Sequence, residues 1–189
     1  MHRFQRRAPL DVTPYPEPPV ADRTGPPLTR GFLFTLVGTV AADECSPEVL
    51  AALSSIDPDA WYHGQLLETI LDEFEARDPS LPHFLGRNVY FMFRRQLESL
   101  GIQSATAVLE SLPRLWMEAT RGDGGEWRSA MVGPKRARLE AEQPYNCLFE
   151  QGAIVGFIES YDAADVRIEH TQCMRKGAPF CVMEVTWQE

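Results

Sequence analysis

Three of the four cysteines lie in the last third of the chain, together with one of its four histidines. They are Cys147, His170, Cys173 and Cys181. Thiolate and imidazole are the protein ligands that zinc prefers, and four of them complete a tetrahedral shell. This spacing predicts a structural zinc site of the three-cysteine, one-histidine type. Because such a site leaves no coordination position for water, we expect it to stabilise the fold rather than to catalyse a reaction.

The residue pattern around these candidates predicts two strands. Residues 165–171 alternate between polar and apolar positions, with His170 on the apolar face. Residues 180–187 alternate in the same way, with Cys181 on that face. If the two segments pair as antiparallel strands, the second of the three cysteines lies in their connection and Cys147 approaches from the start of the preceding helix. An alternative interpretation is that the cysteines are small buried hydrophobic residues and that the histidine belongs to an ordinary core.

The same stretch resembles the 4-vinyl reductase domain, which belongs to the superfamily of ligand-binding domains found in nitric-oxide signalling and Golgi transport. The resemblance covers roughly residues 126–187. It is carried by a cysteine before a helix with glycines four apart, a candidate ligand three residues before a second cysteine, and a third cysteine followed by a strand that ends at Trp187. In the family's aromatic-sensing members, which are attached to bacterial transcription activators, three cysteines and a glutamate hold zinc at this spacing. His170 stands at the glutamate position, and histidine is an equally good zinc ligand.

The composition excludes several classes of protein. The chain has 189 residues, a net charge of −9 and 44% hydrophobic residues, with a pI near 5.0. An acidic chain lacks the basic face that nonspecific binding to nucleic acid requires. No apolar run has the length of a membrane span, and the basic amino terminus is not followed by the apolar core of a signal peptide. Reduced cysteines that could hold a metal fit a cytoplasmic protein.

The chain divides into two predicted parts. Residues 1–28 hold seven of the fifteen prolines and are expected to form a proline-rich tail. This tail is either solvated or extended across the surface of its own domain or of a partner. Residues 29–189 are expected to form a single α+β domain like that of the 4-vinyl reductase family.

The periodicity predicts helices in the middle of the chain and strands near its end. The expected helices cover 46–53, a segment starting at 57, 86–100, a segment starting at 104, and 148–160, while 31–40 fits either a helix or a strand. A hairpin is expected around Gly133 and Pro134. We therefore predict an α+β fold in which a four-stranded antiparallel sheet at the carboxyl end packs against a layer of helices. Gly152 and Gly156 are expected to allow tight packing of a helix on this sheet.

No enzyme motif is present: the sequence contains no GxGxxG, P-loop, HExxH or GxSxG pattern. We therefore expect a protein that is not an enzyme. His63, beside aromatic residues, is a candidate haem ligand, but such a histidine is more often a packing residue.

Three functions fit these observations. The first is a sensory module, with a zinc-braced pocket for a small apolar or aromatic molecule that signals to a separate protein. The expected pocket residues are Trp116, Trp127, Phe149 and Phe157. The second is a protein–protein scaffold of the same fold that forms a homodimer through its helices. The third is an accessory protein of tetrapyrrole metabolism.

Overall fold

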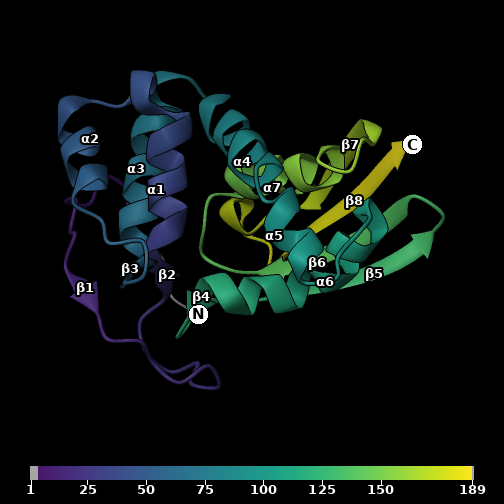
Figure 1. The fold of residues 1–189 in the computed structure, drawn as a ribbon, viewed down its shortest axis with the longest axis horizontal. Helices are drawn as coiled ribbons and strands as arrows, with labels where there is room; N and C mark the ends of the chain where they lie inside the picture. The colour runs from purple at the N-terminus through teal and green to yellow at the C-terminus, as the bar shows by residue number, and fades with distance from the viewer. Residues whose placement is uncertain (1–3, 189) are drawn as a thin grey trace.

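The computed structural model describes residues 4–188, which form two packed parts side by side (Figure 1). The helices are α1 (Gly31–Val40), α2 (Pro47–Ser54), α3 (Gly64–Arg77), α4 (Leu81–Phe91), α5 (Arg94–Ser99), α6 (Ala105–Ala119) and α7 (Cys147–Glu159), with the 3-10 turns η1 (Ala42–Glu44) and η2 (Met174–Lys176). The strands are β1 (Pro14–Tyr15), β2 (Leu28–Arg30), β3 (Trp61–His63), β4 (Thr120–Arg121), β5 (Glu126–Gly133), β6 (Arg136–Glu142), β7 (Ala164–Gln172) and β8 (Cys181–Gln188).

The carboxyl-terminal sheet has the strand order β5-β6-β8-β7, and every neighbouring pair is antiparallel. Helices α5, α6 and α7 lie over one of its faces (Figure 1). Alternate side chains such as Leu139 and Met183 are buried under these helices. Charged pairs such as Arg138 and Glu184, whose side chains lie 3.1 Å apart, are half-exposed. The predicted α+β class is confirmed, with its carboxyl-terminal antiparallel sheet and its layer of helices.

A second, smaller sheet has the order β1-β3-β2-β4 and was not predicted. Its outer strand β1 comes from the proline-rich segment, and Tyr15 pairs with Trp61 of β3. Further toward the amino terminus, the ring of Phe4 packs edge-on against Tyr145 at 5.1 Å. The described part of the proline-rich segment therefore lies extended along its own domain, which is one of the two arrangements considered for it.

Two of the predicted helices differ in their bounds, and the one expected from Gly86 begins at Leu81. Helix α3 begins at Gly64 rather than at Asp57, because the residues between them form a turn and then strand β3. The helix expected over 86–100 is divided, since the amides of Met92 and Phe93 bond to carbonyls three residues back and end α4. Residues 31–40, whose sequence fitted either a helix or a strand, form helix α1. No helix among the described residues is both long and apolar enough to cross a membrane.

Helices α4 and α7 cross with their backbones in contact. A Cβ placed on Gly152 would overlap the carbonyl oxygen of His83, and one on Gly156 would overlap the carbonyl oxygen of Arg87. Gly86 of α4 is equally close to the backbone of α7. The two glycines of α7 therefore allow helix-on-helix packing, and the expectation that they would pack on the sheet was wrong.

The apolar interior consists of two clusters. One contains Phe34 and Phe74 of the helices α1 and α3, and the other lies between the sheet and its covering helices. Tyr90, Phe93 and Trp116 are partly buried and pack against both clusters. These three aromatic side chains mark the boundary at which the two parts of the molecule meet.

Candidate functional site

The four predicted zinc ligands lie together. One potential ligand atom from each of the four side chains is within 4.8 Å of all the others. The sulfur of Cys147 lies 3.6 Å from that of Cys181 and 3.8 Å from that of Cys173. In the part of the chain that the structure describes, no other group of histidine, cysteine and acidic side chains has this geometry.

Local structure explains why these side chains meet. Asn146 caps α7 by accepting hydrogen bonds from the amides of the two residues that follow Cys147, which fixes this cysteine in the first turn. His170 of β7 pairs with Met183 of β8, and Cys181 begins that strand. The tight η2 turn between the strands ends at a glycine with positive φ and directs the amide of Met174 toward the sulfur of Cys181 at 3.4 Å.

The pKa values of the two buried thiols in the cluster shift in opposite directions. The neighbouring thiol of Cys147, the amide of Met174 and the ring of His170 lower the pKa of Cys181 to about 5. Sharing a hydrogen bond with Cys181 and burial both raise the pKa of Cys147. Nε2 of His170 is buried without a hydrogen-bond partner among the described residues, while Nδ1 lies 3.2 Å from the side-chain amide of Gln151. An unpartnered imidazole nitrogen beside three sulfurs is the donor set of a tetrahedral zinc site.

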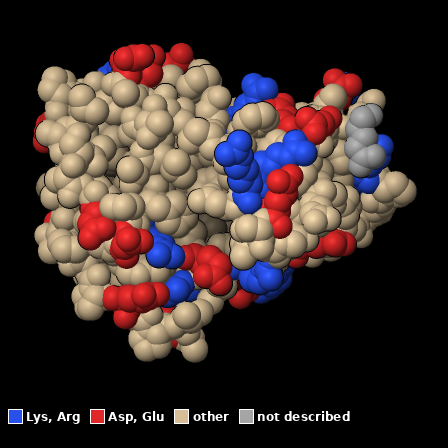
Figure 2. Space-filling view, viewed as in Figure 1, with Lys and Arg blue, Asp and Glu red and all other residues tan. Residues whose placement is uncertain are grey.

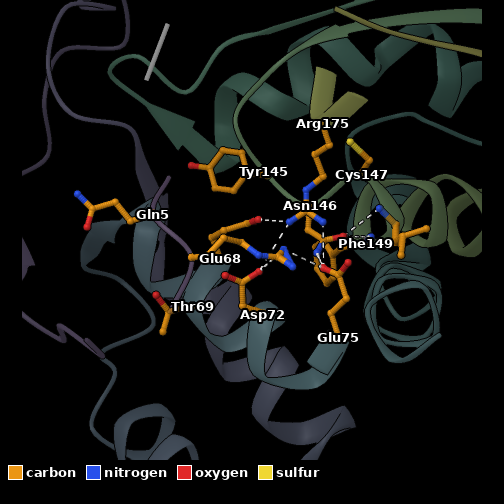
Figure 3. A network of polar contacts seen from close by, with 12 residues as sticks. Gln5, Glu68, Thr69, Asp72, Glu75, Tyr145, Asn146, Cys147, Phe149 and Arg175 are labelled. Carbon is orange, nitrogen blue, oxygen red and sulfur yellow. Dashed lines mark hydrogen bonds and ion pairs between the residues drawn. The ribbon is translucent and has the colours of Figure 1, made fainter. Parts of the chain in front are cut away.

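An ion-pair network connects this cluster to helix α3 (Figure 3). Arg175, in the turn after Cys173, contacts Glu68 and lies 2.9 Å from Glu75 and 3.8 Å from Asp72. Burial raises the pKa of Glu68 to about 7 even though the guanidinium opposes the shift. The turn that carries the candidate metal ligands is thus held on one side by the cluster and on the other by α3.

A cavity of about 370 Å³ lies where the two parts of the molecule meet. Its wall combines the aromatic boundary residues with side chains of α5, α6 and α7 and of strand β5. The aromatic lining residues are Phe32, Tyr90, Phe93, Trp116, Trp127 and Phe157. The surface in Figure 2 is hollowed between the two parts of the molecule, with acidic and basic side chains close by. The volume lies within the range of small-molecule sites.

One of the three acidic side chains that line the cavity is buried, whereas Asp59 and Glu118 are exposed. Glu150, in the first turn of α7, lines the cavity and is only 5% exposed. Burial, with smaller contributions from Glu68 and Cys181, raises its pKa to about 8. Among the described residues its carboxyl group has no hydrogen bond or ion pair.

Three of the four predicted pocket residues line this cavity: Trp116, Trp127 and Phe157. Phe149 is fully buried elsewhere, in the cluster formed with α1 and α3, and faces the ring of Tyr90 at 5.9 Å. Sequence reasoning missed Glu150. Its signal was an acidic residue in the first turn of the mainly apolar helix α7.

The comparisons with known proteins identify the fold. No family model matches the sequence, and no curated protein matches it. Among solved structures, an H-NOX protein from S. oneidensis in the Fe(II)NO ligation state superposes with a TM-score of 0.69 at 15% identity, covering 85% of this chain and 99% of that chain. An unliganded Fe(II) H-NOX protein from K. algicida superposes with a TM-score of 0.61 at 11% identity, covering 85% and 97%. The chain shares the fold of these H-NOX proteins. These neighbours show the fold alone and do not support the predicted 4-vinyl reductase assignment.

The cavity does not fit haem, the group to which the H-NOX fold points. Haem iron in proteins is held by histidine, cysteine, methionine or a tyrosinate. No histidine, cysteine or methionine is among the residues that line the cavity. His63, the candidate haem ligand of the sequence, instead caps α3 by accepting the amide hydrogen of Gln65. Tyr90 does line the wall, but burial raises the pKa of its phenol well above the ordinary value and opposes the tyrosinate form.

Proposed function

We propose that this chain is a sensory, ligand-binding module of the 4-vinyl reductase type. A small apolar or aromatic molecule occupies the cavity, and a structural zinc ion braces its wall. The observation that carries the proposal is a cavity with mainly apolar walls, six aromatic side chains among them, at the meeting point of two packed clusters. Sites of this size and lining are typical of small-molecule binding.

Helix α7 connects the two features. Its first residue, Cys147, belongs to the metal cluster, and Glu150, Ile154 and Phe157 further along the same helix line the cavity. A zinc ion held by four protein ligands would fix the start of α7 against strands β7 and β8. With no open coordination position, the ion would have a structural role, and the module would not be an enzyme.

The test uses full-length protein purified without a metal-affinity step. Metal content is measured by mass spectrometry, and retained small molecules are extracted and identified in parallel. Binding of indole and benzyl alcohol is then followed by calorimetry. We expect one zinc ion per chain and saturable binding of at least one aromatic probe or retained molecule. A well-folded protein that retains no molecule and binds neither probe would contradict the ligand-binding function.

A homodimeric scaffold is the second proposal, and it is supported by exposed apolar side chains on and just after α4. Phe84 is 49% exposed, Phe91 51% and Met92 46%. Sedimentation velocity with the wild type and a Phe84→Ser, Phe91→Ser double variant tests this interface. A wild-type dimer that becomes a monomer in the variant supports it, and a wild-type monomer at high concentration contradicts it.

A further inference from the structure

In the described chain, Glu150 places a buried acid without a hydrogen-bond partner in a mainly apolar wall. A buried carboxyl group without a partner costs free energy in either protonation state, and more as the anion. The groups that influence it most, Glu68 and Cys181, are themselves acidic and raise its pKa. A partner for this carboxyl group is therefore missing from the described chain, and the cavity is the open space beside it.

The charges around the cavity select the sign of that partner. Arg30 is the only cationic side chain that lines the described cavity, and it pairs with Asp59 at 3.4 Å while lying over the ring of Phe32. Glu118 and Glu150 add two further acids. An anionic ligand would meet a single cation, Arg30, whose Nε has no hydrogen-bond partner among the described residues, beside three acidic side chains. A cationic ligand would meet those acidic groups and the electron-rich faces of aromatic rings.

The aromatic side chains near Glu150 could contact a ligand that has an ammonium group attached to an apolar body. Tyr90 lies close enough to Glu150 for this acid to add to the burial that raises the pKa of the Tyr90 phenol. The Tyr90 ring also packs edge-on against Phe157 at 4.7 Å and stacks on Phe93 at 5.4 Å. A carboxyl group bordered by such rings can form an ion pair and cation–π contacts with one ligand group.

We propose that the cavity binds a small primary amine with an aromatic or aliphatic body, and that Glu150 pairs with its ammonium group. The inference rests on the proposed ligand-binding function and names the class of ligand. Glu150 is then the residue that determines specificity, and the aromatic wall provides the apolar contact area.

The experiment compares three probes of similar shape by isothermal titration calorimetry: 2-phenylethylamine, 2-phenylethanol and 3-phenylpropionate. Each is titrated into the full chain, into Glu150→Gln and into Glu118→Gln. The last variant is a matched control, because Glu118 lines the same cavity but is exposed. Circular dichroism and unfolding midpoints establish that both variants are folded.

We expect the amine to bind about 10- to 100-fold more tightly than the alcohol, since an ionised hydrogen bond replaces a neutral one. Glu150→Gln should remove this preference and leave alcohol binding unchanged, and Glu118→Gln should behave like wild type. Equal affinities for amine and alcohol, or amine binding that Glu150→Gln does not weaken, would overturn the inference while leaving the ligand-binding function in place. Failure of all three probes to bind would overturn the inference, and the ligand-binding function would be overturned as well only if the protein also retained no molecule and bound neither indole nor benzyl alcohol.

Discussion

The carbonyl oxygen of His83 occupies the space in which Gly152 would carry a side chain. The two residues lie on α4 and α7, and this contact lets the helix backbones touch where they cross. Because α4 belongs to the amino-terminal packing and α7 to the metal cluster and cavity, the crossing sets the geometry of the whole candidate site.

Gly152→Ala should destabilise the protein by about 1–3 kcal/mol, because the added methyl group forces the helices apart. Urea unfolding followed by circular dichroism measures the change. Gly38→Ala is the matched control: it also lies within a helix, and its added Cβ would meet only Leu53 at 3.5 Å. This control should be neutral or more stable by about 0.5–1 kcal/mol. Equal effects at both glycines would contradict the close crossing.

Arg175→Met should destabilise the protein by about 3–5 kcal/mol, because it leaves the buried acid Glu68 without the cation that contacts it. Arg87→Met removes a pair with Glu159 that is largely exposed, and should have a much smaller effect. Thermal and urea unfolding report both variants. Adding Glu68→Gln to Arg175→Met should restore part of the loss, and failure to do so would argue against buried charge as the cause.

Glu150 should make stability depend on pH. Its pKa rises from the ordinary 4.5 to about 8 on folding, so the folded state holds this proton more tightly than the unfolded state. The stabilisation is complete below about pH 4.5 and is lost as the pH rises through about 8, with a slope of up to about 1.4 kcal/mol per pH unit. Unfolding free energies measured at pH 5.5 and 7.5 should therefore fall with pH more steeply in wild type than in Glu150→Gln. Parallel pH profiles would show that this carboxyl group is not responsible.

Removal of the proposed zinc should lower the melting temperature. Cys181→Ser and His170→Ala are each expected to lose the metal and much of the stability that it provides. Cys45→Ser is the control, because this thiol lies outside the cluster and should retain the zinc. The zinc content of each variant is measured, and its melting temperature is determined by calorimetry with and without a chelator. These measurements distinguish variants that lose the metal from those that retain it. Full metal content in Cys181→Ser would show that the ion is held elsewhere.

The sequence predicted best those segments in which apolar residues repeat with the period of a strand or of a helix. Alternation placed His170 and Cys181 on facing strands, and the helix expected from Leu148 begins one residue earlier, at Cys147. Strand β3 (Trp61–His63) was missed because three residues are too short to show a period.

The lining of the cavity was harder to predict than the metal cluster. Phe149 and Phe157 lie on one helix, yet only Phe157 reaches the cavity, because α4 covers the other. Whether an aromatic side chain such as Tyr90 lines a cavity or fills a core depends on elements far away in the sequence. The spacing of apolar residues within one helix does not show which distant elements pack against it.

The backbone contact between α4 and α7 also restricts how a ligand could enter and leave. Two parts joined by touching helices cannot open about a hinge between them without losing that contact. The ligand would then enter and leave the cavity through movement of side chains such as Leu100, which lines the cavity and is largely exposed. Movements of exposed side chains take picoseconds to nanoseconds, whereas domain opening takes microseconds to milliseconds. Occupancy of the cavity would therefore follow the surrounding ligand concentration quickly, without a slow opening step.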